Sequence, residues 1–92
     1  MIIDFHNPDT EALFHGKRVA RFANIESSAI RKLAMLNRAG QLDDLRVPPG
    51  NRLEKLILDR EGQHSIRIND QWRVCFIWTD AGPKRVEIVD YH

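Results

Sequence analysis

Hydrophobic residues recur at helical spacing in one segment of the first half of the chain, residues 25–39. Four of them follow one another at intervals of 4, 4 and 3: Ile25, Ala29, Leu33 and Leu36. Such spacing places them on one face of an α-helix. Asn24 before the segment is typical of an N-cap, and Gly40 after it is typical of a helix end. The pattern predicts one long amphipathic helix.

The remainder of the first half predicts shorter elements. Residues 1–5 are mostly apolar and predict a first strand, and residues 11–14 predict a short helix capped by Asp9 or Thr10. Residues 41–46 predict one further helical turn. Prolines cannot continue a helix, so helical structure is expected to end at residues 47–51.

The second half of the chain changes to the two-residue alternation of β-strands. Strands are expected in four consecutive segments: residues 52–58, 64–68, 72–78 and 85–91. Residues 52–58 are expected to be buried on both sides at their far end. Short connections predict an antiparallel meander, and the helices that precede it must cover one face of the sheet. We therefore expect a single α+β domain over residues 1–92, with helices on one face of a twisted, mainly antiparallel sheet of four or five strands.

The stretch SIRINDQWRV, residues 65–74, predicts a hairpin with a three-residue turn. If Ile68 faces Trp72, Arg67 lies beside Arg73 on the face away from the helix. Like charges directly opposite each other destabilise a hairpin. Two guanidinium groups could act together as a clamp for a phosphate or carboxylate. Alternatively, each pairs with a nearby acid, and the candidates are Glu54, Glu61 and Glu87.

The chain ends in Asp90, Tyr91 and His92, at the tip of the last predicted strand. If that strand pairs with residues 72–78, its end lies near the arginines. Cleavage of RNA through its own 2′-hydroxyl needs a base, an acid for the departing 5′-oxygen, and cations for the charge that develops on phosphorus. The side chains of this segment with Arg73 form a suitable set, and this route needs no metal or other cofactor.

Composition limits the other possibilities. A net charge of +1 gives no overall basic field of the kind that marks many nucleic-acid binders. No apolar run approaches the roughly 18 residues of a membrane span, and the N-terminus does not resemble a signal peptide. The single Cys75 predicts neither an internal disulfide nor a metal site. We expect a cytoplasmic protein with no membrane contact.

One local basic segment, residues 15–21, carries Lys17, Arg18 and Arg21 close together. These side chains could touch a polyanion such as ribosomal RNA. They could equally belong to an ordinary solvated loop.

Several segments together resemble the HigB branch of the RelE superfamily of toxins. The resemblance is closest over about the last 42 residues, in NRLEKL, DREGQHSIRINDQWRVCF and VEIVDYH, and extends to DTEALFHGK and RKLAMLNRA. It implies a microbial ribonuclease-like α+β fold and cleavage of messenger RNA in the ribosomal A site. It also implies a HigA-type helix-turn-helix antitoxin as partner. Operator DNA would be contacted only through that antitoxin, because this chain shows no helix-turn-helix pattern.

The resemblance also implies roles for particular residues. Arg73 matches the arginine that contacts the scissile phosphate, and Arg67 matches a basic residue on the same strand pair. Tyr91 or His92 would transfer protons, and Asp90 would orient the side chain that does so.

The chain departs from the family pattern at Ile57, where the segment before DREG often carries a lysine. The side chains that could replace its charge are Lys55, Arg60 and His64. The departure supports an alternative reading, in which a catalytically weakened or inactive module mainly binds its antitoxin and takes part in operon autoregulation.

Overall fold

The structure, a computed structural model, describes residues 1–57 and 60–90. Its α-helices are α1 (Pro8–Phe14) and α2 (Glu26–Arg38), and its 3₁₀ helices are η1 (Ala20–Ile25), η2 (Leu42–Arg46) and η3 (Pro49–Asn51). The strands are β1 (Glu54–Lys55), β2 (His64–Arg67), β3 (Trp72–Thr79) and β4 (Gly82–Asp90). Within the described residues they form one sheet in the order β1-β2-β3-β4, with each neighbouring pair antiparallel.

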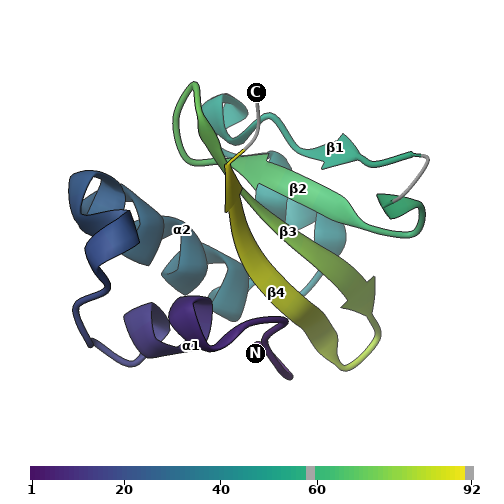
Figure 1. The fold of residues 1–92 in the computed structure, drawn as a ribbon. Coiled ribbons are helices and arrows are strands. Elements are labelled where there is room, and N and C mark those ends of the chain that lie inside the picture. Colours follow the sequence, from purple (N-terminus) through teal and green to yellow (C-terminus); the bar gives the residue numbers. More distant parts are fainter. Residues whose placement is uncertain (58–59, 91–92) are drawn as a thin grey trace.

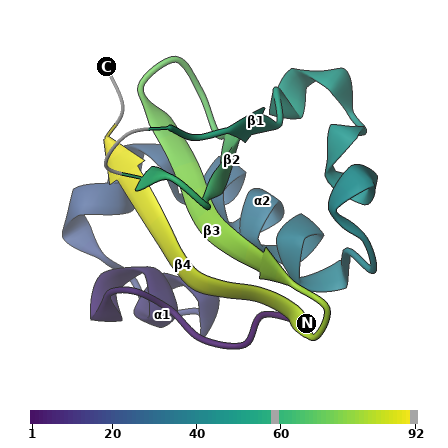
Figure 2. The same cartoon turned by 90° about the vertical axis from the view of Figure 1, so that its right-hand side faces the viewer.

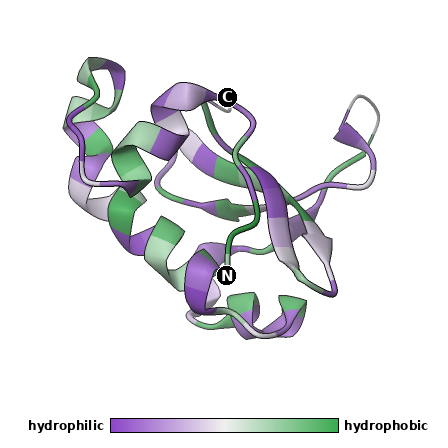
Figure 3. Ribbon diagram, turned by 90° about the horizontal axis from the view of Figure 1, so that it is seen from below, coloured by the Kyte–Doolittle hydropathy of each residue, from purple (hydrophilic) through white to green (hydrophobic). Residues whose placement is uncertain are grey.

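The helices cover one face of this sheet (Figure 1). Figure 2 shows the sheet in front of α2. The core lies between the two layers and includes Ala29, Leu33 and Leu36 from α2 with Val74 and Phe76 from β3. Along α2 hydrophobic residues recur among hydrophilic ones (Figure 3). The predicted α+β class and the helical stripe are therefore confirmed.

The helix boundaries differ from the predicted ones in their caps. Asn7, rather than Asp9 or Thr10, caps α1, and its side chain accepts a hydrogen bond from the Thr10 N–H at 2.9 Å. Asn24 does not cap α2, because η1 already includes it and leads directly into α2 at Glu26. A 3₁₀ turn also forms at Pro49–Asn51, where helical structure was expected to end. This turn is compatible with proline because Pro49 is its first residue.

The predicted first strand, residues 1–5, is not a strand of the described sheet. Phe5 makes an isolated parallel bridge to Val86, and the Ile3 N–H donates to the Pro83 carbonyl at 2.8 Å. These contacts place the segment along the outer edge of β4 without a continuous ladder.

The predicted strand over residues 52–58 is much shorter than expected. Only Glu54–Lys55 pairs with β2. Arg52 cannot join the strand because it takes a left-handed backbone conformation (φ 44°) that an extended strand does not allow. Leu56 is buried, but Ile57 is 71% exposed, so the expected burial on both sides was wrong. Leu58 lies outside the described residues.

The central hairpin has the predicted register. Arg67 pairs with Arg73, and Ser65 pairs with Cys75. The Ile68 N–H donates to the Trp72 carbonyl at 2.9 Å, as the three-residue turn requires. Ile66 and Val74 face the helices and belong to the core.

None of the helices among residues 1–57 and 60–90 is long and apolar enough to cross a membrane.

Candidate functional site

Arg73 lies on the face of β3 away from the helices and is only 8% exposed. Its Nε donates a hydrogen bond to Ser65 Oγ at 2.7 Å, and its Nη2 donates to the Arg52 carbonyl at 2.6 Å and the Ser65 carbonyl at 3.3 Å. Glu54 Oε2 is 3.7 Å from Nη2. We call this group of Arg73, Ser65, Arg52 and Glu54 the Arg73 cluster. It holds a buried cation in one fixed orientation.

Arg67 starts opposite Arg73 but has a different partner. Its guanidinium forms an ion pair with Asp70, the exposed acid of the hairpin turn. The positive charge of Arg67 also helps to lower the pKa of Lys32 on α2. The two guanidinium groups therefore bind different partners, which explains how like charges are tolerated at directly opposed positions.

The alternative in which nearby acids pair with these arginines is confirmed for one of the three acids named. Glu54 lies beside Arg73, whereas Glu87 pairs with Arg60 and the acid beside Arg67 is Asp70. The prediction that Arg67 and Arg73 together form one clamp is therefore wrong for this structure, because each guanidinium has its own acidic neighbour.

Glu87 forms a second polar centre on the same face of the sheet, next to Cys75 in the register. Arg60 Nη1 donates to Glu87 Oε1 at 3.2 Å, and Asn7 Nδ2 donates to Oε2 at 3.5 Å. His6 Nε2 is 3.9 Å from Oε2. Arg60, one of the predicted RNA-binding residues, thus forms an ion pair with Glu87 on β4.

The thiol between these two centres is not a nucleophile. Cys75 is completely buried, and burial raises its pKa to about 11. The thiol is therefore protonated near neutral pH, and the reactive thiolate is scarce.

His64 on β2 and its pairing partner Lys55 on β1, both predicted to bind RNA, belong to the opposite face of the sheet from Arg73. They pair with each other, and His64 stacks on the Phe76 ring with centroids 6.3 Å apart. Alternation places the Phe76 side of the strands toward the helices. The structure therefore does not bring His64 or Lys55 together with Arg73.

The pKa of His64 is lowered, first by burial and then by the positive charges of Lys55 and Arg46. Within the part of the chain that the structure describes, its buried Nδ1 has no hydrogen-bond partner. A neutral imidazole packed on an aromatic ring fits this environment.

The last strand, β4, pairs with β3 as the sequence predicted. Val89 is opposite Arg73 and Asp90 is opposite Trp72, so the end of β4 lies beside the start of β3. Gln71 Nε2 donates to Asp90 Oδ2 at 3.0 Å. Tyr91 and His92 lie outside the described residues.

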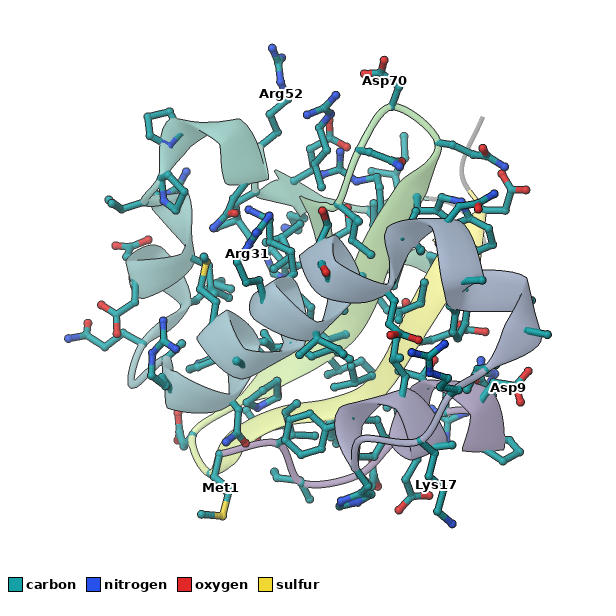
Figure 4. All side chains as sticks on the ribbon, turned by 90° about the vertical axis from the view of Figure 1, so that its left-hand side faces the viewer. Met1, Asp9, Lys17, Arg31, Arg52 and Asp70 are labelled. Carbon is teal, nitrogen blue, oxygen red and sulfur yellow. The ribbon has the colours of Figure 1, made fainter. Side chains whose placement is uncertain are left out.

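The basic segment predicted as a loop, residues 15–21, is at the other end of the molecule, and its last two residues, Ala20 and Arg21, belong to η1. Lys17 lies beside α1, whereas Arg52 and Asp70 lie at the opposite end (Figure 4). Arg21 forms an exposed ion pair with Asp9 at 3.3 Å and lies over the Phe22 ring at 4.8 Å. The structure therefore does not add Lys17, Arg18 or Arg21 to the Arg73 cluster.

Sequence reasoning missed two contributors to the cluster. The Arg52 carbonyl reaches Arg73 because of the left-handed backbone at residue 52, and no local sequence pattern predicts that conformation. Asn51, fully buried, holds the preceding turn: its Nδ2 donates to the Leu45 carbonyl at 3.1 Å. A polar side chain directly after two prolines and a glycine was the available signal for a structural asparagine.

Among residues 1–57 and 60–90, no group of three His, Cys, Asp or Glu side chains is placed to hold a metal ion.

The chain is similar in sequence to several known proteins. The family described as the RelE-like toxin of the type II toxin-antitoxin system HigB matches residues 10–92. Toxin HigB-1 of Vibrio cholerae is 38% identical over 83 residues, which cover 88% of this chain and 87% of that protein. An uncharacterized protein of Haemophilus influenzae is 37% identical over 54 residues, 59% of this chain and 54% of that one.

The solved YoeB-YefM complex from Staphylococcus aureus contains a chain with the same fold. The TM-score is 0.57 at 20% sequence identity, over 100% of this chain and 98% of that one. The family match and the Vibrio relative both span most of the sequence. The chain therefore belongs to the HigB-like family of RelE-like toxins of type II toxin-antitoxin systems.

Proposed function

We propose that this toxin is a metal-independent endoribonuclease that cuts messenger RNA in the ribosomal A site and thereby inhibits translation. The observation that carries the proposal is the fixed guanidinium of Arg73 beside the end of β4, within a HigB-like chain. RelE-like toxins are generally endoribonucleases, which agrees with this assignment.

The proposed chemistry uses the RNA 2′-hydroxyl as the nucleophile. Arg73 stabilises the negative charge that develops on the scissile phosphate. Its hydrogen bonds to Ser65 and Arg52 hold the guanidinium in place before the substrate arrives, so that little reorganisation is needed during the reaction. Tyr91 or His92 transfers protons to and from the RNA oxygens, and Asp90 orients them.

We further propose that cleavage depends on the ribosome. The chain has Ile57 where the family often has a lysine, so its own set of catalytic groups is reduced. A ribosome that holds the messenger in a reactive geometry can compensate, because positioning alone is worth up to about 7–11 kcal/mol. Operator DNA would be contacted only through a HigA-type antitoxin, which would also neutralise the toxin.

Purified toxin incubated with a naked transcript and with programmed 70S ribosomes tests this proposal. We expect mapped transcript ends to show cuts on ribosomes and negligible cutting of the naked transcript. Truncation before Tyr91 should abolish the cuts. Efficient cleavage of naked RNA would overturn ribosome dependence, and ribosomal cleavage by the truncated chain would overturn the proton-transfer roles.

A second candidate is a catalytically weakened module that mainly binds its antitoxin. Two observations favour it: Ile57 is exposed and uncharged, and Arg73 is 8% exposed with its Nε and Nη2 already hydrogen-bonded. Because Ile57 is 71% exposed, Ile57→Lys should be tolerated by the fold. If the missing lysine limits activity, this variant should strengthen growth arrest on controlled expression. Equally strong growth arrest by the wild type and by Ile57→Lys would instead show that a lysine at position 57 is dispensable.

A further inference from the structure

Four basic side chains come from three parts of the chain that contact one another around Asn51, Lys32 and Arg73. We call them the α2–η3 basic patch: Arg31 and Lys32 on α2, Arg52 directly after η3, and Arg67 at the end of β2. Figure 4 shows Arg31 on α2 and Arg52 at the end of the molecule where Asp70 also lies.

Lys32 is at the centre of this patch. Its Nζ donates a hydrogen bond to Asn51 Oδ1 at 2.5 Å, which links α2 to η3. Burial lowers the pKa of Lys32, and the positive charges of Arg31 and Arg67 lower it further. Lys32 is thus close enough to Arg31 and to Arg67 for repulsion between the like charges.

Arg52 connects the patch to the Arg73 cluster. Its carbonyl accepts the 2.6 Å hydrogen bond from Arg73, and its own side chain is exposed. Its φ of 44° is in the left-handed region, which costs a residue with a Cβ about 1 kcal/mol or more and which glycine adopts freely. This conformation turns the Arg52 carbonyl toward Arg73, so the exposed side chain of Arg52 belongs to the same backbone segment that contacts Arg73.

Acidic side chains balance little of this charge. Within residues 1–57 and 60–90, Arg67 pairs with Asp70, but no carboxylate forms an ion pair with Arg31, Lys32 or Arg52. Isolated surface cations are usually just solvated. Here Lys32, which is partly buried, experiences the positive charges of Arg31 and Arg67, so a row of negative charges would relieve this repulsion. A phosphodiester backbone supplies such a row.

We propose that the α2–η3 basic patch binds the backbone of a single-stranded RNA that continues from the Arg73 cluster. The inference rests on the proposed function, because it takes the RNA bound at Arg73 as the strand that the patch extends. Phosphate contacts of this kind carry no sequence preference and position the strand.

The test compares two variants that each lose two positive charges. Arg31→Gln with Arg52→Gln removes the two exposed arginines of the patch. Arg38→Gln with Lys84→Gln is the control, since Arg38 is about two turns further along α2 and Lys84 is on β4, opposite Ile77. The probes are a fluorescein-labelled 2′-O-methyl RNA oligonucleotide, which cannot be cut through a 2′-hydroxyl, and 70S ribosomes without messenger.

We expect the patch variant to bind the oligonucleotide about tenfold more weakly than the control variant at low salt. The slope of log K against log salt should fall by about 1.4, since each phosphate contact to a single strand contributes about 0.7. A loss on vacant ribosomes alone would assign the patch to ribosomal RNA rather than to the messenger, and still to an RNA backbone.

Equal binding by the two variants on both probes would overturn the proposal, as would a wild-type chain that binds neither probe. Loss of antitoxin binding with RNA binding intact would also overturn it and assign the patch to the protein partner. Cleavage is measured separately on programmed ribosomes. A wild-type chain that does not cut, while the patch variant loses RNA binding, would reject the proposed activity and leave the patch in place.

Discussion

The Arg73 cluster and the basic loop at residues 15–21 contain the same type of residue in opposite environments. Arg73 is 8% exposed and donates to Ser65 and to the Arg52 carbonyl. Lys17, Arg18 and Arg21 are largely at the surface, and Arg21 pairs with Asp9 where both side chains are about half exposed. Water and salt screen the loop charges, whereas the cluster keeps its cation in a setting of weaker screening.

The comparison shows that position in the sheet, rather than local charge density, distinguishes these regions. The loop has the denser run of basic residues in the sequence. In the cluster, the orientation of Arg73 is fixed by groups that lie 8 and 21 residues away in the sequence. A fixed cation can stabilise a transition state without reorganising, and a mobile one cannot do so as well.

The largest combined loss of stability and of ribosomal cleavage is expected for Arg73→Ala. It leaves Ser65 Oγ and the Arg52 carbonyl without their donor, so the free energy of unfolding should fall by about 1–3 kcal/mol. Ribosomal cleavage should be lost beyond what the loss of folded protein explains. Urea unfolding and transcript mapping measure the two effects. The control is Arg67→Ala, whose exposed acid partner makes a change of about 1 kcal/mol or less the expected result. Equal stability of both variants would contradict the cluster geometry.

A smaller loss of activity, with a similar loss of stability, is expected for Asn51→Ala. The side chain of Asn51 is fully buried, accepts from Lys32 and donates to the Leu45 carbonyl, so its removal should cost about 1–3 kcal/mol, without removing a charged group. The segment that presents the Arg52 carbonyl would loosen, and activity should fall less than in Arg73→Ala. Asn24→Ala, at an exposed position, is the matched control and should change stability by at most about 0.5 kcal/mol. Similar unfolding midpoints for the two alanine variants would reject this role for Asn51.

A pH-dependent effect is expected at His64, on the helix side of β2. Burial, Lys55 and Arg46 lower its pKa, so the unfolded chain binds a proton at a higher pH than the folded chain does. The free energy of unfolding should therefore decrease as the pH falls below about 6.5, the usual pKa of histidine. The difference between the wild type and His64→Gln, measured by urea unfolding across this range, isolates the contribution. Parallel curves for the two proteins would show that His64 titrates as it does in the unfolded chain.

The smallest effect on stability is expected when Lys17, Arg18 and Arg21 are all replaced by glutamine. Their exposure predicts a change of at most about 0.5 kcal/mol. If the loop contacts ribosomal RNA, cosedimentation with ribosomes should weaken and become less sensitive to salt. Unchanged cosedimentation would leave the loop as an ordinary solvated segment.

Local sequence patterns determined the main features of this protein. Helical spacing identified α2, strand alternation identified β2, β3 and β4, and the three-residue turn fixed the pairing of Arg67 with Arg73. Alternation and turn length act between residues that are near in the chain, so the sequence displays them directly. The GQHSIRINDQWRVCF and DYH motifs also indicated the family that the comparisons show.

Only the tertiary structure decided which partners the predicted site residues contact, among those that it describes. Arg73 is hydrogen-bonded to Ser65 and the Arg52 carbonyl while Arg67 pairs with Asp70, although the register makes the two arginines direct neighbours. His64 packs on Phe76 instead of joining the arginines. These outcomes depend on the backbone at Arg52 and on burial against distant elements. Both are set by contacts between parts of the chain that no single stretch of sequence contains.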